Sequence, residues 1–161
     1  MTQFRELLRV LSEAGVEFIV VGGVAAFAHG AARVTLDLDL VYRRTPANLE
    51  RIVQALAPHH PYPRGAPDGL PFHWDGSTVQ FGINFALRTN LGFLDLLGEI
   101  SAGGTYDDLL AHTQLIEVYA MPCRCLDLEE LIRVKRAVGR PKDFEVVAEL
   151  EAIRDRGDLQ E

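Results

Sequence analysis

Residues 16–42 read VEFIVVGGVAAFAHGAARVTLDLDLVY, and this stretch decides the fold class. It opens with a short, mostly β-branched and apolar run at 16–21, which is typical of a strand buried on both faces. The run leads directly into Gly22 and Gly23, and the alanine-rich residues 24–29 that follow predict a short helix. A buried strand, a glycine turn and a helix in this order predict an α/β domain.

The segment 34–42 alternates as VTLDLDLVY, the pattern of a strand with two unlike faces. Side chains alternate along a strand, so Thr35, Asp37 and Asp39 share one face. The Cα atoms of the two aspartates would lie about 6.6 Å apart, which lets both carboxylates converge on one hard cation. The alternative is the solvated face of an edge strand, although aspartate is depleted in strands.

The rest of the chain continues the alternation of helical and strand-like segments. The proline-rich stretch 58–71 is expected to be an irregular loop, and a turn at 88–90 predicts a hairpin. We expect helices at 4–14, 46–57, 106–112, 128–138 and 141–155, and strands at 79–85, 92–97 and 116–125, the last broken at Pro122.

Length and composition limit the kind of protein. A chain of 161 residues is close to the commonest size of a single domain, and a net charge of −7 disfavours long duplex nucleic acid as a partner. The only cysteines, Cys123 and Cys125, are too close in sequence for a disulfide framework. No apolar run reaches the roughly 18 residues of a membrane span. These features predict a cytoplasmic protein.

Asp95 is the single charge in the apolar run 91–97. Burial of a lone carboxylate is costly unless the group is paired or binds a metal ion. We therefore interpret Asp95 as a third metal-binding carboxylate. The alternatives are an ion pair with an arginine such as Arg88 or Arg33, or a short helix that turns Asp95 toward water.

The glycine pair adds a second requirement. Gly22 and Gly23 carry no side chains, so backbone N–H groups there could approach a phosphate closely. The pair has neither the lysine of a P-loop nor the spacing of a dinucleotide fingerprint. Together with two aspartates one short helix later, it indicates a phosphate site beside a metal site, as a nucleoside triphosphate requires.

These motifs resemble the signature of the polymerase-beta-type nucleotidyltransferase superfamily, and in particular its small bacterial AbiEii-like branch. The C-terminal stretch LEELIRVKRAVGRPKD at 128–143 is similar to the helical segment that closes many members of this branch. The resemblance spans nearly the whole chain apart from residues 58–78. It rests on VVGG at 20–23, His29, Gly30, Arg33, Thr35, Asp37 and Asp39.

The resemblance implies a mixed β-sheet flanked by helices, in a single domain at 1–161 with a catalytic core at 1–125 and C-terminal helices at 126–161. It implies that Asp37, Asp39 and Asp95 hold Mg²⁺ or Mn²⁺, with Asp95 helping to activate an attacking hydroxyl. The residues expected at the nucleotide are Gly22, Gly23, Arg33, Thr35, Lys135 and Lys142, although a lone lysine or arginine is more often a solvated surface residue.

The implied activity is transfer of a nucleoside monophosphate from ATP or another nucleoside triphosphate to a hydroxyl group, with release of pyrophosphate. The acceptor could be a protein, an RNA end or a small molecule. The alternatives are a non-catalytic module of the same fold that binds a nucleotide or a partner, such as a toxin–antitoxin component, and a purely structural oligomerisation domain. A homodimer or an antitoxin is compatible as a partner.

Other polar and aromatic residues have simpler explanations. Asp107 and Asp108 lie at an expected helix start, where capping explains them. Trp74 and Phe72 could stack on a base, but packing is the commoner role. The five histidines show no ligand spacing with the cysteines, so no zinc site is predicted.

Overall fold

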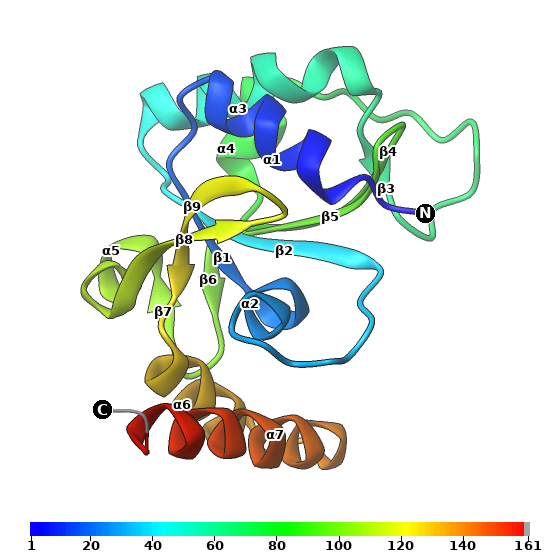
Figure 1. Cartoon of the computed structure of the whole chain (residues 1–161). Helices are drawn as coiled ribbons and strands as arrows, with labels where there is room; N and C mark the ends of the chain where they lie inside the picture. The colour runs from blue at the N-terminus through cyan, green and yellow to red at the C-terminus, as the bar shows by residue number, and fades with distance from the viewer. Residues whose placement is uncertain (160–161) are drawn as a thin grey trace.

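The computed structural model describes residues 1–159, and a seven-stranded mixed sheet forms its centre (Figure 1). The sheet contains β1 (Phe18–Val21), β2 (Asp37–Tyr42), β3 (Tyr62–Pro63), β4 (Asn84–Thr89), β5 (Gly92–Leu97), β8 (Thr113–Val118) and β9 (Met121–Leu126). Its strand order is β3-β4-β5-β2-β1-β9-β8. The pairs β2/β5 and β1/β9 are parallel and the other pairs are antiparallel. A separate ribbon pairs β6 (Glu99–Ile100) with β7 (Gly104–Thr105).

Helices cover both faces of this sheet. They are α1 (Phe4–Glu13), α2 (Gly22–Ala28), α3 (Pro46–Leu56), α4 (Gly76–Phe81), α5 (Tyr106–Leu109), α6 (Leu128–Val138) and α7 (Pro141–Asp158), with 3₁₀ turns at Ala57–His59 and Leu110–His112. Figure 1 shows α1, α3 and α4 on one side of the sheet, α2 on the other, and α6 and α7 as a pair beyond α2. The predicted mixed sheet flanked by helices, with a C-terminal helical segment, is confirmed.

The two C-terminal helices begin and end at residues with clear local preferences. The Asp127 side chain accepts a hydrogen bond from the Glu130 N–H at 2.8 Å and caps the start of α6. Gly139 ends this helix with φ of +68°, which glycine adopts without strain. Pro141 then takes the first position of α7, where its missing N–H would have no partner.

The two faces of β2 differ as the alternation predicts. Leu38 and Leu40 are fully buried in the core beneath α1 and α3, whereas Asp37 and Asp39 are only partly buried and belong to the opposite face. Burial of a leucine side chain stabilises the fold by about 1.5–3 kcal/mol. The apolar face thus fixes which way the two carboxylates point.

Strand β2 is shorter than predicted, because it begins at Asp37 rather than at Val34. Its neighbour β1 ends at Val21, opposite Asp39, and its other neighbour begins at Gly92. Residues 34 and 35 therefore lie beyond the ends of both neighbouring strands, and Val34 is 90% exposed.

Two other predicted strands are wrong in detail. The first half of 79–85 lies in α4, because the Asp75 side chain caps that helix by accepting the Thr78 N–H at 2.8 Å. The segment 116–125 belongs to two strands, β8 and β9, joined at Tyr119 and Ala120, whose φ angles of 50° and 65° make the turn. Pro122 lies within β9 instead of breaking it. The predicted hairpin is confirmed as β4 and β5, but its turn lies at Asn90 and Leu91, because Arg88 and Thr89 still pair with β5.

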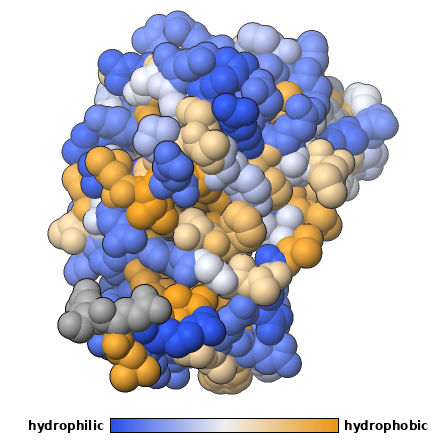
Figure 2. All heavy atoms as spheres, in the orientation of Figure 1, coloured by the Kyte–Doolittle hydropathy of each residue, from blue (hydrophilic) through white to orange (hydrophobic). Residues whose placement is uncertain are grey.

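Hydrophobic side chains also reach the surface. Figure 2 shows hydrophilic residues over the part of the molecule that holds α1 and α3, and hydrophobic residues across its middle. The exposed apolar residues include Phe27, Val34, Leu36 and Leu115. Within residues 1–159, no helix combines the length and apolar character needed to cross a membrane.

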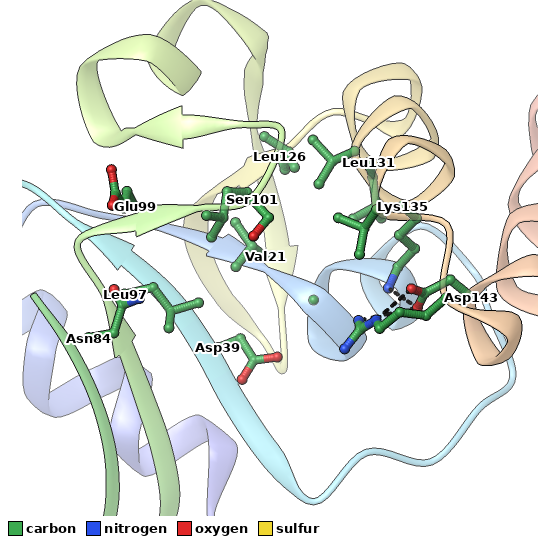
Figure 3. Close-up of a pocket in the computed structure, with 15 residues that line it drawn as sticks. Val21, Asp39, Asn84, Leu97, Glu99, Ser101, Leu126, Leu131, Lys135 and Asp143 are labelled. Atoms are coloured by element: carbon green, nitrogen blue, oxygen red, sulfur yellow. Dashed lines mark hydrogen bonds and ion pairs between the residues drawn. The ribbon is translucent and has the colours of Figure 1, made fainter.

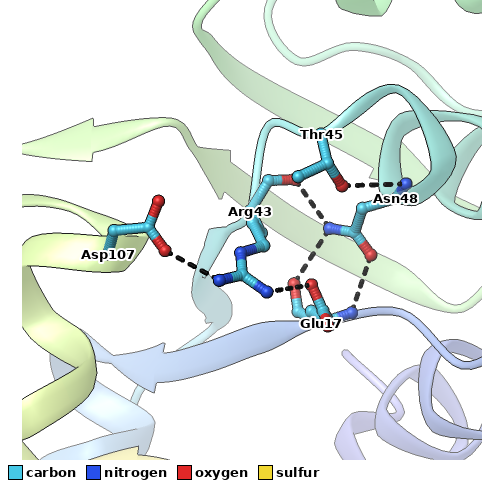
Figure 4. A network of polar contacts seen from close by, with 5 residues as sticks. All are labelled: Glu17, Arg43, Thr45, Asn48 and Asp107. Carbon is cyan, nitrogen blue, oxygen red and sulfur yellow. Dashed lines mark hydrogen bonds and ion pairs between the residues drawn. The ribbon is translucent and has the colours of Figure 1, made fainter.

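A buried amide joins α3 to the ends of β1 and β2 (Figure 4). The Asn48 side chain is fully buried, accepts the Glu17 N–H at 2.8 Å and donates to the carbonyl oxygens of Glu17 and Arg43 at 3.1 and 2.7 Å. Arg43 in turn forms ion pairs with Glu17 and Asp107, each at 3.1 Å. The network closes the end of the sheet away from Asp37.

We expect Asn48→Ala to lower the free energy of unfolding by about 2–4 kcal/mol, because it removes three hydrogen bonds and leaves the Glu17 N–H and the Arg43 carbonyl oxygen without these partners. Urea unfolding followed by circular dichroism measures this change. Gln54→Ala removes an exposed amide from the same helix and should change stability by less than about 0.5 kcal/mol. An equal loss of stability in Asn48→Ala and Gln54→Ala would contradict a stabilising role for the hydrogen bonds of Asn48.

Candidate functional site

Three aspartates meet on one face of the sheet. Strands β2 and β5 are parallel neighbours, in a register that pairs Asp37 with Phe93 and Asp39 with Asp95. Residues in register on adjacent strands point to the same face, and so do residues two apart on one strand. The structure therefore brings together the three carboxylates that the sequence singled out.

The N-terminal segment holds the starts of these two strands together. The Thr2 hydroxyl donates to the Leu36 carbonyl oxygen at 2.5 Å and accepts the Phe93 N–H at 3.1 Å. Gly92 makes this contact feasible, because a Cβ at that position would overlap Thr2. Sequence reasoning missed Thr2, since nothing local links residue 2 to residues 36 and 93.

The glycine pair lies against the carboxylate face. A Cβ on Gly22 would overlap Asp39 Oδ2 and lie 3.0 Å from its Cγ, and Gly22 has φ of +66°. A Cβ on Gly23 would lie 2.9 Å from Thr35 Oγ1. Both glycines belong to the first turn of α2 instead of preceding it. Absence of a side chain at these two positions lets the turn approach Asp39 and Thr35.

Asp39 is the most perturbed of the three carboxylic acids. Burial raises its pKa to about 7, and the hydrogen bond and charge of Asp95 and the charge of Asp37 act in the same direction. Arg64 acts in the opposite direction. Close carboxylates favour either a shared proton or a bound cation, because each disfavours ionisation of the other.

A guanidinium group lies between two of the aspartates. Arg64 Nη1 is 3.1 Å from Asp37 Oδ1, and Arg64 Nη2 forms an ion pair with Asp95 Oδ1. The Arg64 Cζ atom lies 5.3 Å from the centre of the Phe93 ring. Arg64 comes from the proline-rich stretch that was expected to be irregular, and sequence reasoning missed it.

The arginines considered as partners for Asp95 are engaged elsewhere. Arg88 pairs with Asp68, and Arg33 pairs with Glu145 and Glu149 of α7 at 2.8 and 3.6 Å. Asp95 is therefore paired with an arginine, as one of the alternatives predicts, but its partner is Arg64 and not Arg88 or Arg33.

The donors suit a hard divalent cation by their chemistry, because they are three carboxylates and Mg²⁺ and Mn²⁺ prefer oxygen ligands. Within residues 1–159, no group of three His, Cys, Asp or Glu side chains is positioned to hold a metal ion as the chain stands. The guanidinium of Arg64 contacts Asp37 and Asp95, where such an ion would bind. The three carboxylates therefore suit a divalent cation by their chemistry, while two of them are paired with Arg64 in this arrangement.

A cavity of about 310 Å³ opens beside the carboxylates (Figure 3). It lies between the β1–α2 turn, the ribbon that follows β5, and helices α6 and α7. Gly22 and Asp39 line one wall, Ser101 the next, and Lys135 and Asp143 the wall formed by the C-terminal helices. A volume of this size suits a small-molecule ligand.

Lys135 brings a buried cation to this cavity. Its side chain is 15% exposed, and its Nζ lies 4.0 Å from Asp143 Oδ1. Burial lowers the pKa of Lys135, whereas the charge of Asp143 raises it. Asp143 also accepts a 2.8 Å hydrogen bond from Arg140. Lys142 is exposed at the start of α7.

The remaining residues have structural roles. Asp108 forms a capping box with Thr105 at the start of α5. Trp74 Nε1 donates to the Val53 carbonyl oxygen at 3.0 Å, and the Phe72 ring packs edge-on against Tyr62. Cys123 and Cys125 are buried free thiols, and burial raises their pKa values to about 11 and 12.

The chain is similar to proteins described as nucleotidyltransferases. Residues 1–56 match the family model described as "Nucleotidyl transferase of unknown function (DUF2204)". This match covers the glycine pair, Thr35, Asp37 and Asp39, and ends before Asp95. A search of curated protein sequences finds no match.

Solved structures match over almost the whole chain. The lincomycin-bound lincosamide antibiotic adenylyltransferase LnuA matches with a TM-score of 0.62 and 14% identity, over 94% of this chain and 96% of that chain. The antibiotic-resistance factor ANT(2'')-Ia matches with a TM-score of 0.55 and 17% identity, over 98% and 90%. A Thermotoga maritima protein described as a nucleotidyltransferase matches with a TM-score of 0.56 and 14% identity, over 92% of this chain and 94% of that chain. The chain therefore has the fold of these proteins.

Proposed function

We propose that the protein is a metal-dependent nucleotidyltransferase that transfers a nucleoside monophosphate from a nucleoside triphosphate to a hydroxyl group. The observation that carries this proposal is the convergence of Asp37, Asp39 and Asp95 on one face, with Asp39 against the side-chain-free Gly22. The family match over residues 1–56 and the shared fold support the same activity.

The three carboxylates would hold a metal ion, and one of them also takes part in proton transfer. Asp37, Asp39 and Asp95 would hold the divalent cation, Mg²⁺ or Mn²⁺, which when bound neutralises charge on the reacting phosphate oxygens. Asp95 accepts the proton of the acceptor hydroxyl as its oxygen bonds to the α-phosphorus. The bond from the α-phosphorus to the bridging oxygen breaks, and pyrophosphate leaves with that electron pair.

The cavity is the proposed nucleotide site. Gly22 lines this cavity beside Asp39, and the glycine pair lets the start of α2 lie against Asp39 and Thr35. Lys135 supplies positive charge from the opposite wall, and the exposed Lys142 directly precedes Asp143 in α7. Arg33 has the weakest claim to a phosphate contact, since two carboxylates of α7 already bind its guanidinium.

A turnover assay tests this proposal. The wild-type protein should release labelled pyrophosphate from one of the four triphosphates when Mg²⁺ or Mn²⁺ and an acceptor are present. Asp37→Asn should lower this rate at least about a hundredfold, because it removes one charged cation ligand. A thermal-shift screen of the four triphosphates, with and without Mg²⁺, would select the donor beforehand.

The second candidate is a binding module of the same fold without turnover. The ion pairs of Arg64 with Asp37 and Asp95 favour it, because they satisfy the carboxylates without a metal ion. Triphosphate binding that does not depend on a metal ion, with no turnover of any acceptor tested, would establish this candidate. Failure of the wild-type protein to bind either metal or triphosphate would refute both.

The sequence resemblance also bears on the domain bounds, the location, the partner and the acceptor. We propose one domain over residues 1–161, with the segment 126–161 closing the nucleotide cavity, although residues 160 and 161 lie outside the described part. A cytoplasmic location, an AbiEii-like origin, and an antitoxin or a second copy as partner remain predictions. Among the acceptors, a small molecule is the first to test, because LnuA is described as lincomycin-bound.

A further inference from the structure

We propose that Arg64 keeps free divalent cations off the catalytic carboxylates, so that the metal ion enters with the nucleoside triphosphate. This inference rests on the proposed function, because it concerns the same carboxylates. Its basis is the placement of one guanidinium against two aspartates on neighbouring strands.

The guanidinium is well suited to this role. Its planar fork presents Nη1 to Asp37 and Nη2 to Asp95, which are two of the three carboxylates that would hold the cation. Nη1 is buried and has no well-oriented hydrogen-bond partner within the described chain. The face of Phe93 covers the group from another direction. A divalent cation and this guanidinium would repel each other at such short range, so only one of them occupies the position.

The backbone around Arg64 is held by hydrogen bonds, so only the side chain has to move for Arg64 to leave Asp37 and Asp95. The Arg64 N–H donates to the Ala86 carbonyl oxygen at 2.9 Å, and the preceding β3 pairs with β4. The Tyr62 hydroxyl is bonded to carbonyl oxygens within the following loop at 2.8 and 3.1 Å. Release of the carboxylates therefore requires rotation of a long side chain and no unfolding of the loop.

A nucleoside triphosphate changes the competition between the metal ion and the Arg64 guanidinium for the carboxylates. Its phosphates carry negative charge that accompanies the metal ion, and they offer the freed guanidinium a bidentate partner of the kind arginine prefers. The metal–triphosphate complex can thus replace the Arg64 contacts at little electrostatic cost, whereas the free metal ion cannot. Arg64 consequently makes metal binding depend on nucleotide.

Manganese binding without nucleotide tests the inference. We expect Arg64→Gln to bind Mn²⁺ at least about tenfold more tightly than wild type, as measured by loss of the free-Mn²⁺ electron paramagnetic resonance signal. Arg64→Lys should give an intermediate affinity, since an ammonium keeps the charge but cannot bridge two carboxylates. A non-hydrolysable triphosphate itself binds Mn²⁺, so calorimetry is used to measure binding of the Mn²⁺–triphosphate complex, for which the wild-type and Arg64→Gln affinities should differ by less than about threefold.

The matched control is Arg88→Gln, which removes an equal charge from the adjacent strand. Arg88 stacks on Tyr62 and pairs with Asp68 of the same loop, without touching the three aspartates. An unchanged Mn²⁺ affinity in folded Arg64→Gln would overturn the inference, and so would an equal gain in Arg88→Gln. If no variant binds Mn²⁺ even with the triphosphate, the proposed function fails instead.

Discussion

Replacement of Asp39 by asparagine is expected to lower nucleotidyl transfer at least about a thousandfold. Asp39 is the middle carboxylate of the three, in register with Asp95, two residues from Asp37 and against Gly22. An amide keeps the shape of the side chain but removes the negative charge that a divalent cation needs. Metal ions and fixed charges supply several kcal/mol of transition-state stabilisation in phosphoryl transfer, so loss of a central ligand removes most of the rate.

The same substitution should make the metal-free protein more stable at pH 8. Burial and the neighbouring carboxylates raise the pKa of Asp39 to about 7 in the folded protein, above its ordinary value of about 4. The folded protein therefore binds this proton more tightly than the unfolded chain does. The associated stabilisation is complete below about pH 4 and is lost as the pH rises through about 7, a change on the order of 2–4 kcal/mol.

Asparagine does not ionise, so Asp39→Asn should lack this part of the pH dependence. Urea unfolding in the presence of a chelator, at pH 5 and at pH 8, measures the difference between the two proteins. Asp107→Asn is the control, because Asp107 is an exposed carboxylate whose ion pair with Arg43 lies outside the site. A variant that is inactive and also less stable than wild type at pH 8 would indicate a structural role for Asp39.

The sequence predicts the carboxylate face because that face depends on local periodicity. Alternation places Asp37 and Asp39 on the side opposite Leu38 and Leu40, and burial of the leucines then fixes the orientation. The assignment of Asp95 needed one further step, the cost of a buried charge, and the parallel register beside Asp39 is consistent with it. These arguments use at most a few neighbouring residues.

The residues that were missed reach the site through long-range pairing. Arg64 arrives because a two-residue strand pairs with β4, and Thr2 arrives through single hydrogen bonds to distant backbone groups. Neither residue lies in a periodic pattern, and the prolines around Arg64 predict only an irregular segment. The error at 79–85 has a related cause, because a single capping aspartate, Asp75, outweighs the strand-like composition that follows it.

The Gly22 position offers the second large effect, since we expect Gly22→Ala to lower transfer at least about a hundredfold and stability by about 2–4 kcal/mol. Its φ of +66° costs a residue with a Cβ roughly 1–2 kcal/mol. The added methyl group would also overlap the Asp39 carboxylate, so that side chain must leave its place in the carboxylate face. A displacement of about 1 Å in a catalytic group is enough for a loss of this size.

Gly15→Ala separates the effect of backbone strain from the effect of overlap with Asp39. Gly15 has φ of +75°, but a Cβ there would meet only the flexible Arg51 side chain, at 3.9 Å. This control should lose stability by about 1–2 kcal/mol and keep full activity. A Gly22→Ala and Asp39→Ala double variant removes the overlap with the carboxylate and leaves only a 3.1 Å contact with the Cβ of residue 39, so the combined loss of stability should be smaller than the sum of the single losses. Additive losses would mean that backbone strain alone explains why glycine is needed beside the carboxylates.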